Sequence, residues 1–543
     1  MSSSPTNRSP EAGPVDAPLW RRALAVLRPG HRHSPFSATV LLMASVTASR
    51  LIGLVRVKYI AWLLGRSAAA DAFNAAFQLP DMVSYFLVGG AASITFITIL
   101  TRYRDEGREH EGERAMSAIL TMMAVVLGGA VLVAEFAAPW FVRWWFAGFP
   151  AEKAALCTHL TRILLPAQLC FFAGGVFGAV LLVRRVFSVQ AVAPLVYNAG
   201  IILGGVIGGI FLAREASVSW LAIGALAGAF CGPFLLNAIG AHRVGMRFRP
   251  LLDWNNPGLR EWVRMSIPLM LGVSLVTADN WIINYFASHV GGAITLLTYA
   301  KTLFTAPVAL GQAAGAASLP FLAALFGKQD RRPFAEAVNS SVSRILAFSF
   351  LLSAFMIAMA LPLVDVLVRG GAFHRADSGV MALYFAIFSV SLCLWSAQAL
   401  YARAFYAAGN TITPMVAGTI ITAASIPVYW TLYRALGPMG LAMASDAGIL
   451  LQTTALAVLL HRRRMVSLAG LEYGELGRAL LAALVSFAAL AALRHLVHTT
   501  SRLHELALLA AAAFLWITVA GLVLRFTGSS LTGQLLSRFS SRA

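Results

Sequence analysis

Long apolar runs separated by short polar connections dominate this chain from Ser37 to Phe526. Most runs reach or exceed about 20 residues, the length at which a helix crosses the roughly 30 Å hydrocarbon core of a bilayer. The pattern therefore predicts an all-α polytopic membrane protein with about fourteen transmembrane helices. The predicted helices cover residues 37–65, 68–101, 115–142, 154–183, 188–213, 217–241, 259–287, 291–326, 334–368, 378–408, 411–433, 437–461, 475–496 and 503–527.

The polar connections carry an uneven charge. With the N-terminus in the cytoplasm and the connections alternating in side, the cytoplasmic segments hold about three times as many lysines and arginines as the opposite side. This bias places both termini in the cytoplasm. The formal net charge of +19 reflects loops that meet anionic lipid, and it does not indicate nucleic-acid binding, because no basic stretch forms a folded module of its own.

Two basic connections divide the chain into units. One, at 241–264, follows the sixth predicted helix, and the other, at 461–478, follows the twelfth. Repeated helical halves around a central site are a common plan of transporters. We therefore expect two six-helix lobes around a central cavity and an additional helical pair, flanked by a disordered basic cytoplasmic tail and a second cytoplasmic tail. Their ranges are 37–245, 258–462, 475–527, 1–36 and 528–543.

Three basic residues interrupt the first predicted helix, namely Arg50, Arg56 and Lys58. Placing an arginine at the centre of a bilayer costs roughly 2.5–3.5 kcal/mol, so such residues normally face a water-filled cavity or a partner. Arg50 lies about 20 Å along its helix, which is too deep for its side chain to reach the cytoplasmic interface easily. Arginine can hold two phosphate oxygens at once, and the sequence therefore predicts a cavity for an anionic substrate such as a diphosphate.

Further charged residues lie in other predicted helices. Asp71 opens the second helix, where it can interact with the helix dipole or form an ion pair. Asp279 and Asp446 lie near the middle of their helices and could bind a coupling cation or pair with a basic residue. Lys301, in the eighth helix, is either the partner of an acid or a contact for the substrate.

Several kinds of chemistry have no support in the sequence. It contains no G-x-x-x-x-G-K-[ST] phosphate loop, no H-E-x-x-H motif and no close cluster of histidines and cysteines. We therefore expect a secondary transporter without a metal or cofactor, and not an enzyme. The four cysteines lie in or beside apolar runs and are expected to fill the core; they are Cys157, Cys170, Cys231 and Cys393.

Five short motifs add a specific resemblance. They are SRLIGLVR (49–56), ADAFNAAFQLPD (70–81), APLVYN (193–198), LVRGGAFHRAD (367–377) and ARAFYAAGNTITP (402–414). In this order and spacing they resemble the MurJ/MviN family of lipid II flippases, part of the multidrug/oligosaccharidyl-lipid/polysaccharide exporter superfamily. The resemblance extends over about residues 38–465.

The resemblance implies a function and a set of site residues. Family members flip the undecaprenyl-diphosphate-linked peptidoglycan precursor, lipid II, from the cytoplasmic to the periplasmic leaflet of the bacterial inner membrane by alternating access, for cell-wall synthesis. The implied partners are lipid II, membrane lipids and peptidoglycan synthesis proteins. The family's substrate-binding positions fall on Ser49, Arg50 and Arg56. Its aspartate at the start of the second helix falls on Asp71, which we expect to form an ion pair during gating with one of the cations Arg50, Arg56 and Lys301.

The chain also departs from the family pattern. The family has arginines after its L-P-N, whereas here L-P-D is followed by Met82, Val83 and Ser84. Lys301 stands where the family has an acid, and we hypothesise that it replaces the missing arginine in binding the substrate. Ser425 and Tyr429 occupy positions where a family sodium site would have Asn or Asp, which argues against sodium coupling.

Three alternatives stay open at this point. The first is a flippase for another polyprenyl-linked glycan, of the O-antigen type. The second is a cation-coupled multidrug antiporter, which predicts an acidic cavity. The third is a membrane-embedded glycosyl or phosphoglycosyl transferase, which needs a catalytic carboxylate and usually a metal site near one interface.

Overall fold

Helices make up most of the residues that the computed structural model describes. In the part of the chain that it describes, the β pairing is an isolated bridge between Gly370 and Phe373. Nearly all of the predicted tails, 1–36 and 528–543, lies outside the described residues. The described ranges are 35–87, 91–184, 186–211, 214–271, 273–326, 332–497 and 501–530.

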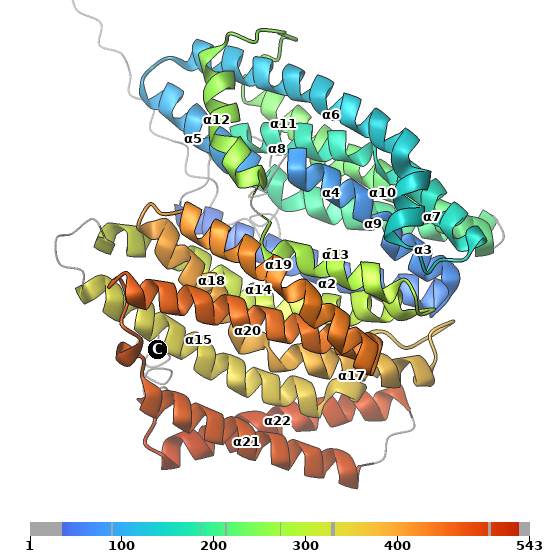
Figure 1. The fold of residues 1–543 in the computed structure, drawn as a ribbon, viewed down its shortest axis with the longest axis vertical. Coiled ribbons are helices and arrows are strands. Elements are labelled where there is room, and N and C mark those ends of the chain that lie inside the picture. The colour runs from blue at the N-terminus through green and yellow to red at the C-terminus, as the bar shows by residue number, and fades with distance from the viewer. Residues whose placement is uncertain are drawn as a thin grey trace, which may run out of the picture.

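The helices form two large groups and an outer pair (Figure 1). The first group is drawn at the top and the second in the middle of Figure 1. The first group consists of α3 (Ala68–Ala76), α4 (Gln78–Leu87), α5 (Ala91–Asp105), α6 (Glu109–Trp145), α7 (Ala151–Leu164), α8 (Ala167–Val183), α9 (Ser188–Phe211), α10 (Arg214–Ala229), the π-helix η1 (Phe230–Leu236), α11 (Asn237–Arg243) and α12 (Pro257–Leu271).

The outer pair of helices comes last in the chain, and the second group comes before it. The helices of the second group are α13 (Leu275–Ala287), α14 (Ala293–Phe326), α15 (Arg332–Ala358), α16 (Ala360–Leu367), α17 (Arg375–Val390), α18 (Leu392–Ala407), α19 (Ile412–Leu436) and α20 (Pro438–Arg462). A short 3-10 turn, η2 (Leu468–Gly470), leads to the outer pair, α21 (Tyr473–Leu496) and α22 (Arg502–Phe526). The outer pair packs against α15 and α16.

The first long helix, α2 (Pro35–Leu64), contacts both groups. It packs mainly against α9 and also touches α3 and α14. A continuous buried core joins the two groups here, with side chains from α2, α3 and α7 packed among those of α13, α14 and α17. The two groups are therefore held together by apolar packing on one side of the molecule.

Several predicted helices are broken. The predicted helix 68–101 is divided among α3, α4 and α5, and the predicted helix 259–287 is divided between α12 and α13. Ser274 accepts a hydrogen bond from Val276 N and caps α13, which gives the new helix its start. Since α12 packs on α5 and α6 whereas α13 packs on α19 and α20, the chain crosses between the groups inside this predicted helix.

When helices are counted by length and hydrophobicity, fewer can span a membrane than the sequence predicted. Among the described residues, nine helices are long and apolar enough to cross a membrane, or ten if α17 and α18, bent by 42°, count as one span. The predicted all-helical membrane fold is confirmed, whereas the count of about fourteen is not. Two of the remaining four predicted spans are broken, because α3, α4, α12 and α13 are each too short to cross alone, and the other two correspond to α2 and α14, which are not among the nine.

Candidate functional site

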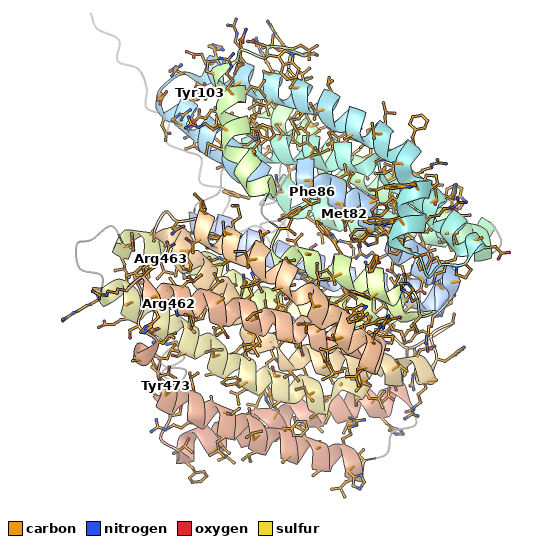
Figure 2. All side chains as sticks on the ribbon, in the orientation of Figure 1. Met82, Phe86, Tyr103, Arg462, Arg463 and Tyr473 are labelled. Carbon is orange, nitrogen blue, oxygen red and sulfur yellow. The ribbon has the colours of Figure 1, made fainter. Side chains whose placement is uncertain are left out.

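A cavity of about 820 Å³ lies between the two groups of helices. Its walls come from α2, α3, α4, α9, α13 and α14, so both groups contribute. Figure 2 shows Met82 and Phe86 on α4 where the two groups face each other. Polar side chains are frequent on the wall, and include Asn74, Gln78 and Asn284. This is the predicted central cavity.

Charged side chains reach the cavity from both groups. Among the described residues that line it, the charged ones are Arg56, Asp81 and Lys301. Arg56 shares the wall with Tyr197 and Tyr299 and forms no ion pair within the described part of the chain. The wall is thus mixed in charge, with an unpaired guanidinium on the side of α2.

Lys301 belongs to an ion pair at the cavity wall. Its ammonium group contacts the carboxylate of the fully buried Asp279. Asp279 also accepts hydrogen bonds from the hydroxyl of Tyr429 and from Ser445 Oγ, the latter at 2.8 Å. Lys301 Nζ lies 5.9 Å from the ring centroid of Trp395. Lys301 therefore has an acidic partner in this state, one of the two roles that its sequence position suggested.

The other carboxylate considered for cation coupling is Asp446. Its Oδ1 is buried and has no hydrogen-bond partner among the described residues. No group of three or more His, Cys, Asp or Glu residues in the described part of the chain could hold a metal ion. Asp279 is instead neutralised by a lysine of the chain itself, so cation coupling through Asp279 and Asp446 stays a prediction.

Two predicted substrate residues lie outside the cavity wall. Ser49 is half-buried and Arg50 is exposed, and neither is among the lining residues. Arg50 precedes Arg56 by six residues, which places it about 9 Å away along the helix and about 120° around it. In this state of the protein, Ser49 and Arg50 therefore do not lie where they could contact a substrate in the cavity.

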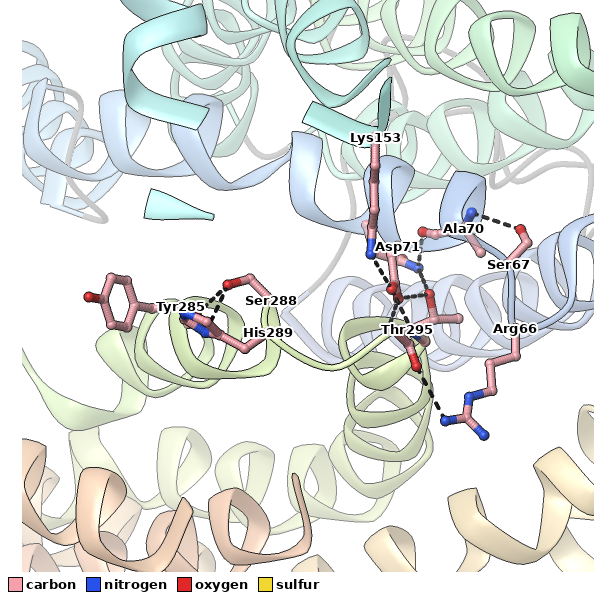
Figure 3. A network of polar contacts seen from close by, with 12 residues as sticks. Arg66, Ser67, Ala70, Asp71, Lys153, Tyr285, Ser288, His289 and Thr295 are labelled. Atoms are coloured by element: carbon pink, nitrogen blue, oxygen red, sulfur yellow. Dashed lines mark hydrogen bonds and ion pairs between the residues drawn. The ribbon is translucent and has the colours of Figure 1, made fainter. Parts of the chain in front are cut away.

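Asp71 lies at a separate polar cluster where the two groups meet (Figure 3). Its carboxylate is fully buried and forms an ion pair with Lys153 at 2.6 Å. It also accepts hydrogen bonds from Gly292 N at 2.7 Å, Thr295 N at 2.9 Å and Thr295 Oγ1 at 2.6 Å. Its partners differ from the cations expected from the sequence, which were Arg50, Arg56 and Lys301.

This cluster also caps a helix. Gly292 and Thr295 lie at the start of α14, where the first backbone N–H groups have no partner within the helix. Asp71 comes from α3 of the first group, and it supplies the acceptor for two of these N–H groups of the second group. A carboxylate at this end is also favoured by the helix dipole.

Other contacts close the same end of the molecule. Ala372 N donates to Trp62 O at 2.9 Å, and Lys58 Nζ donates to Val366 O at 2.8 Å. A Cβ placed on Gly148 would lie 2.4 Å from the Cα of His289, so the backbones there touch. The two groups are joined tightly beside Asp71, and the cavity lies beyond this junction along α3 and α4.

Lys153 and Thr295 were missed by reasoning from the sequence. Lys153 lies 82 positions from Asp71 in the chain. Because it is next to a loop, it served only as one of the loop charges that indicate membrane orientation. Thr295 is one of many hydroxyl residues in apolar runs. A basic residue at the start of one helix can lie close to an acid at the start of another. The sequence alone does not reveal such a pair, because the two residues meet only when the helices pack.

Comparison with known proteins adds an independent line of evidence. The family model for the lipid II flippase MurJ matches residues 60–512. A probable lipid II flippase MurJ of Treponema pallidum is 24% identical over 453 residues, covering 81% of this chain and 84% of that protein. The lipid II flippase MurJ of Burkholderia cenocepacia is 27% identical over 447 residues, covering 79% of this chain and 84% of that protein.

Solved structures agree on the fold. A lipid II flippase MurJ in an inward closed conformation superposes with a TM-score of 0.73 at 18% identity, covering 90% of this chain and 99% of that one. An inward-facing multidrug resistance MATE family transporter of the MOP superfamily gives a TM-score of 0.62 at 14% identity, covering 79% of this chain and 98% of that one. Since the family model covers most of the sequence and the relatives agree with it, this chain belongs to the MurJ family of lipid II flippases.

Proposed function

We propose that this protein flips lipid II, the undecaprenyl-diphosphate-linked peptidoglycan precursor, from the cytoplasmic to the periplasmic leaflet of the bacterial inner membrane. Family membership and the names of the relatives support this function and a transporter rather than an enzyme. The multidrug antiporter is not favoured, because the family match is to lipid II flippases.

One observation in the structure supports an anionic substrate most directly. Arg56 presents a guanidinium to the cavity and has no acidic partner within the described part of the chain. A planar guanidinium can donate two parallel hydrogen bonds to a phosphate group. In this proposal Arg56 holds the diphosphate, and the polyprenyl tail stays in the lipid.

Lys301 adds a second cation when the substrate is present. In this state it is paired with Asp279, so a diphosphate has to compete with that carboxylate for the ammonium group. Tyr429 and Ser445 hydrogen-bond to Asp279 and reduce the cost of leaving its charge without Lys301. Lys301 thereby replaces the second-helix arginine that the family pattern has and this chain lacks.

Alternating access follows from the junction beside Asp71. In this proposal the Asp71 end of the molecule lies on the periplasmic side, as the loop charges predict, and the structure is then a state closed to the periplasm. Release of the headgroup then requires Asp71 to separate from Gly292 and Thr295 at the start of α14, whereas its pair with Lys153 lies within the first group. The membrane potential, worth about 2.3 kcal/mol per charge for each 100 mV, favours outward movement of an anionic headgroup.

Complementation tests this function. Bacterial cells depleted of their own lipid II flippase would receive the wild-type chain, Arg56→Ala or the control Arg463→Ala, an exposed residue after α20 (Figure 2). At equal membrane abundance we expect rescue by the wild type and the control and loss of rescue with Arg56→Ala. Rescue by Arg56→Ala would exclude the role given to this arginine, and failure of the wild type would point to another polyprenyl-linked glycan.

Arg50 and Ser49 are tested in the same cells. They stay predicted substrate contacts although they do not line the cavity of this state. If they meet the headgroup in another state of the cycle, Arg50→Ala and Ser49→Ala lose rescue while the purified variants bind undecaprenyl diphosphate as the wild type does. Full rescue by both variants would show that Ser49 and Arg50 are not needed for contact with the substrate.

A further inference from the structure

Asp81 is an acid on the wall of the central cavity that the proposed function leaves without a role. It lies in the first turn of α4, and it forms no ion pair or side-chain hydrogen bond within the described part of the chain. Its side chain is exposed and lines the cavity. The start of a helix favours a carboxylate. A charged group within a membrane protein nevertheless points to function when the chain provides no partner of opposite charge.

A smaller space of about 240 Å³, which we call the Asp81 side pocket, adjoins the central cavity. It shares four wall residues with the cavity, so the two spaces meet at Asp81; the four are Phe77, Asp81, Ser84 and Tyr197. Asp81 and Ser84 are one turn apart and therefore lie on the same side of α4. Gln168 of α8 adds a further polar side chain. The side pocket has room for the end of one flexible side chain of a ligand, or for a few water molecules.

The polar groups of the Asp81 side pocket suit a cation that donates hydrogen bonds. Asp81 offers a carboxylate, Ser84 and Tyr197 offer hydroxyl oxygens, and Gln168 offers an amide oxygen. None of the described residues on this wall is basic. A primary ammonium group has three N–H donors and no acceptor, so it can use several such oxygens at once. A hydrogen bond between two charged groups is also stronger than one between neutral groups.

Arg56 and Asp81 carry opposite charges on one cavity wall, yet they do not pair with each other. Tyr197 interacts electrostatically with both groups, so the two charges belong to the same region of the wall. Opposite charges attract strongly where little water is present. Two that stay apart are complementary to a ligand that carries both an anion and a cation. The diphosphate of the proposed substrate supplies the anion for Arg56.

We propose that Asp81 and its side pocket bind a primary ammonium group of the substrate while Arg56 holds the diphosphate. The peptide of a peptidoglycan precursor can supply this group, because a diamino acid in it ends in a free amine. The ammonium group pairs with the carboxylate of Asp81 and donates to Ser84 Oγ and Gln168 Oε1. This inference rests on the proposed function and narrows the substrate to headgroups with an amine. The family pattern L-P-N has asparagine where this chain has Asp81, so we assign the preference to this chain.

Binding to the purified full-length protein in detergent tests this site. The probes are lipid II with a free lysine amine, the same lipid after acetylation of that amine, and undecaprenyl diphosphate. The wild type should bind the free amine about tenfold more tightly than the acetylated lipid, equivalent to about 1.4 kcal/mol. Asp81→Asn should bind both lipids equally. It should bind undecaprenyl diphosphate at least as tightly as the wild type, because a negative charge has left the cavity.

The matched control removes the same charge outside the cavity. Asp105 is exposed at the end of α5, and Asp105→Asn should keep the preference for the free amine. Equal binding of the two lipids by the wild type would overturn the proposal, and so would a preference that persists in Asp81→Asn. Failure of the proposed function gives a different result, because the wild type would then bind neither lipid II nor undecaprenyl diphosphate.

A sodium ion is another cation that a carboxylate with neighbouring oxygens can hold. The same titrations are therefore made in sodium chloride and in choline chloride of equal ionic strength. If the side pocket takes the ammonium group of the substrate, the preference for the free amine is the same in both salts. A preference that disappears in sodium chloride would show that Asp81 holds a sodium ion instead, and it would overturn the proposal.

Discussion

Asp71 shows how a carboxylate can be buried completely between two groups of helices. Its two oxygens accept four hydrogen bonds, from the ammonium group of Lys153, two backbone N–H groups and one hydroxyl. The cost of removing a charge from water is offset only when such partners are in place. The sequence predicted an ion pair or a dipole contact for Asp71, and the structure contains both, but the identity of Lys153 required the packed helices.

Removing one member of this pair should destabilise the protein strongly. Asp71→Asn leaves Lys153 without its acidic partner, at a cost of about 3–5 kcal/mol. Thermal unfolding of the purified protein in detergent would show a lower midpoint, and Asp71→Asn/Lys153→Met should recover part of it. The control Glu111→Gln, whose pair with Arg108 is exposed, should change stability by less than about 1 kcal/mol. Equal midpoints for Asp71→Asn and the control would contradict this account.

The ion pair of Asp279 and Lys301 at the cavity wall leads to a different prediction, because its loss should strengthen the binding of an anionic substrate. Asp279→Asn removes the charge that holds Lys301, so the ammonium group becomes available to an anion in the cavity. Undecaprenyl diphosphate should bind the purified variant about tenfold more tightly, equivalent to about 1.4 kcal/mol. Lys301→Met should weaken binding. Weaker binding by a folded Asp279→Asn variant would show that Lys301 is structural.

At the scale of elements, small residues determine how closely helices approach. Gly200, Gly204 and Gly224 allow the backbones of α9 and α10 to touch, and a Cβ on Gly204 would lie 2.3 Å from Trp220 O. Gly204 and Gly208 have the small-x-x-x-small spacing that is typical of closely packed helices, and both lie against α10. The sequence did not reveal the break between α12 and α13, because both lie in one apolar region and only three residues, 272–274, separate them, the last of which is the capping Ser274.

Two glycines of α9 provide a matched test of this packing. Gly204→Val should force α9 and α10 apart and destabilise the protein by about 1–3 kcal/mol. Gly209→Val adds the same side chain to the same helix where nothing lies within 4 Å. Thermal unfolding in detergent should therefore separate the two variants. Similar unfolding midpoints for the two variants would mean that α9 and α10 can move apart without a loss of stability.

At the scale of the whole molecule, two groups of helices enclose a cavity and are joined beside Asp71. The hydrophobic pattern predicted the all-helical membrane fold, the pair 475–527 and the residues Arg56 and Lys301 that line the cavity. It could not show which groups touch at the closed end, because these contacts join residues far apart in the chain. It also assigned α12 to the second lobe, although α12 packs on the first.

Labelling of single cysteines tests which side is closed. With the four native cysteines replaced by serine, a membrane-impermeant maleimide should label Asn280→Cys, in the cavity, from the same side as Arg463→Cys. Gly291→Cys lies at the closed end and should react from the opposite side. Intact spheroplasts and inside-out vesicles expose the two sides separately. Labelling of Asn280→Cys together with Gly291→Cys would place the opening at the other end.

The helix cap supplied by Asp71 makes the start of α14 a natural reporter of the transport cycle. Whenever the two groups separate there, the amides of Gly292 and Thr295 lose their acceptor and become open to solvent. Their rate of hydrogen–deuterium exchange then measures the fraction of time that the protein spends open at this end. A substrate that promotes opening accelerates exchange at these amides, whereas an inhibitor that holds the groups together slows it, with no label or substitution in the chain.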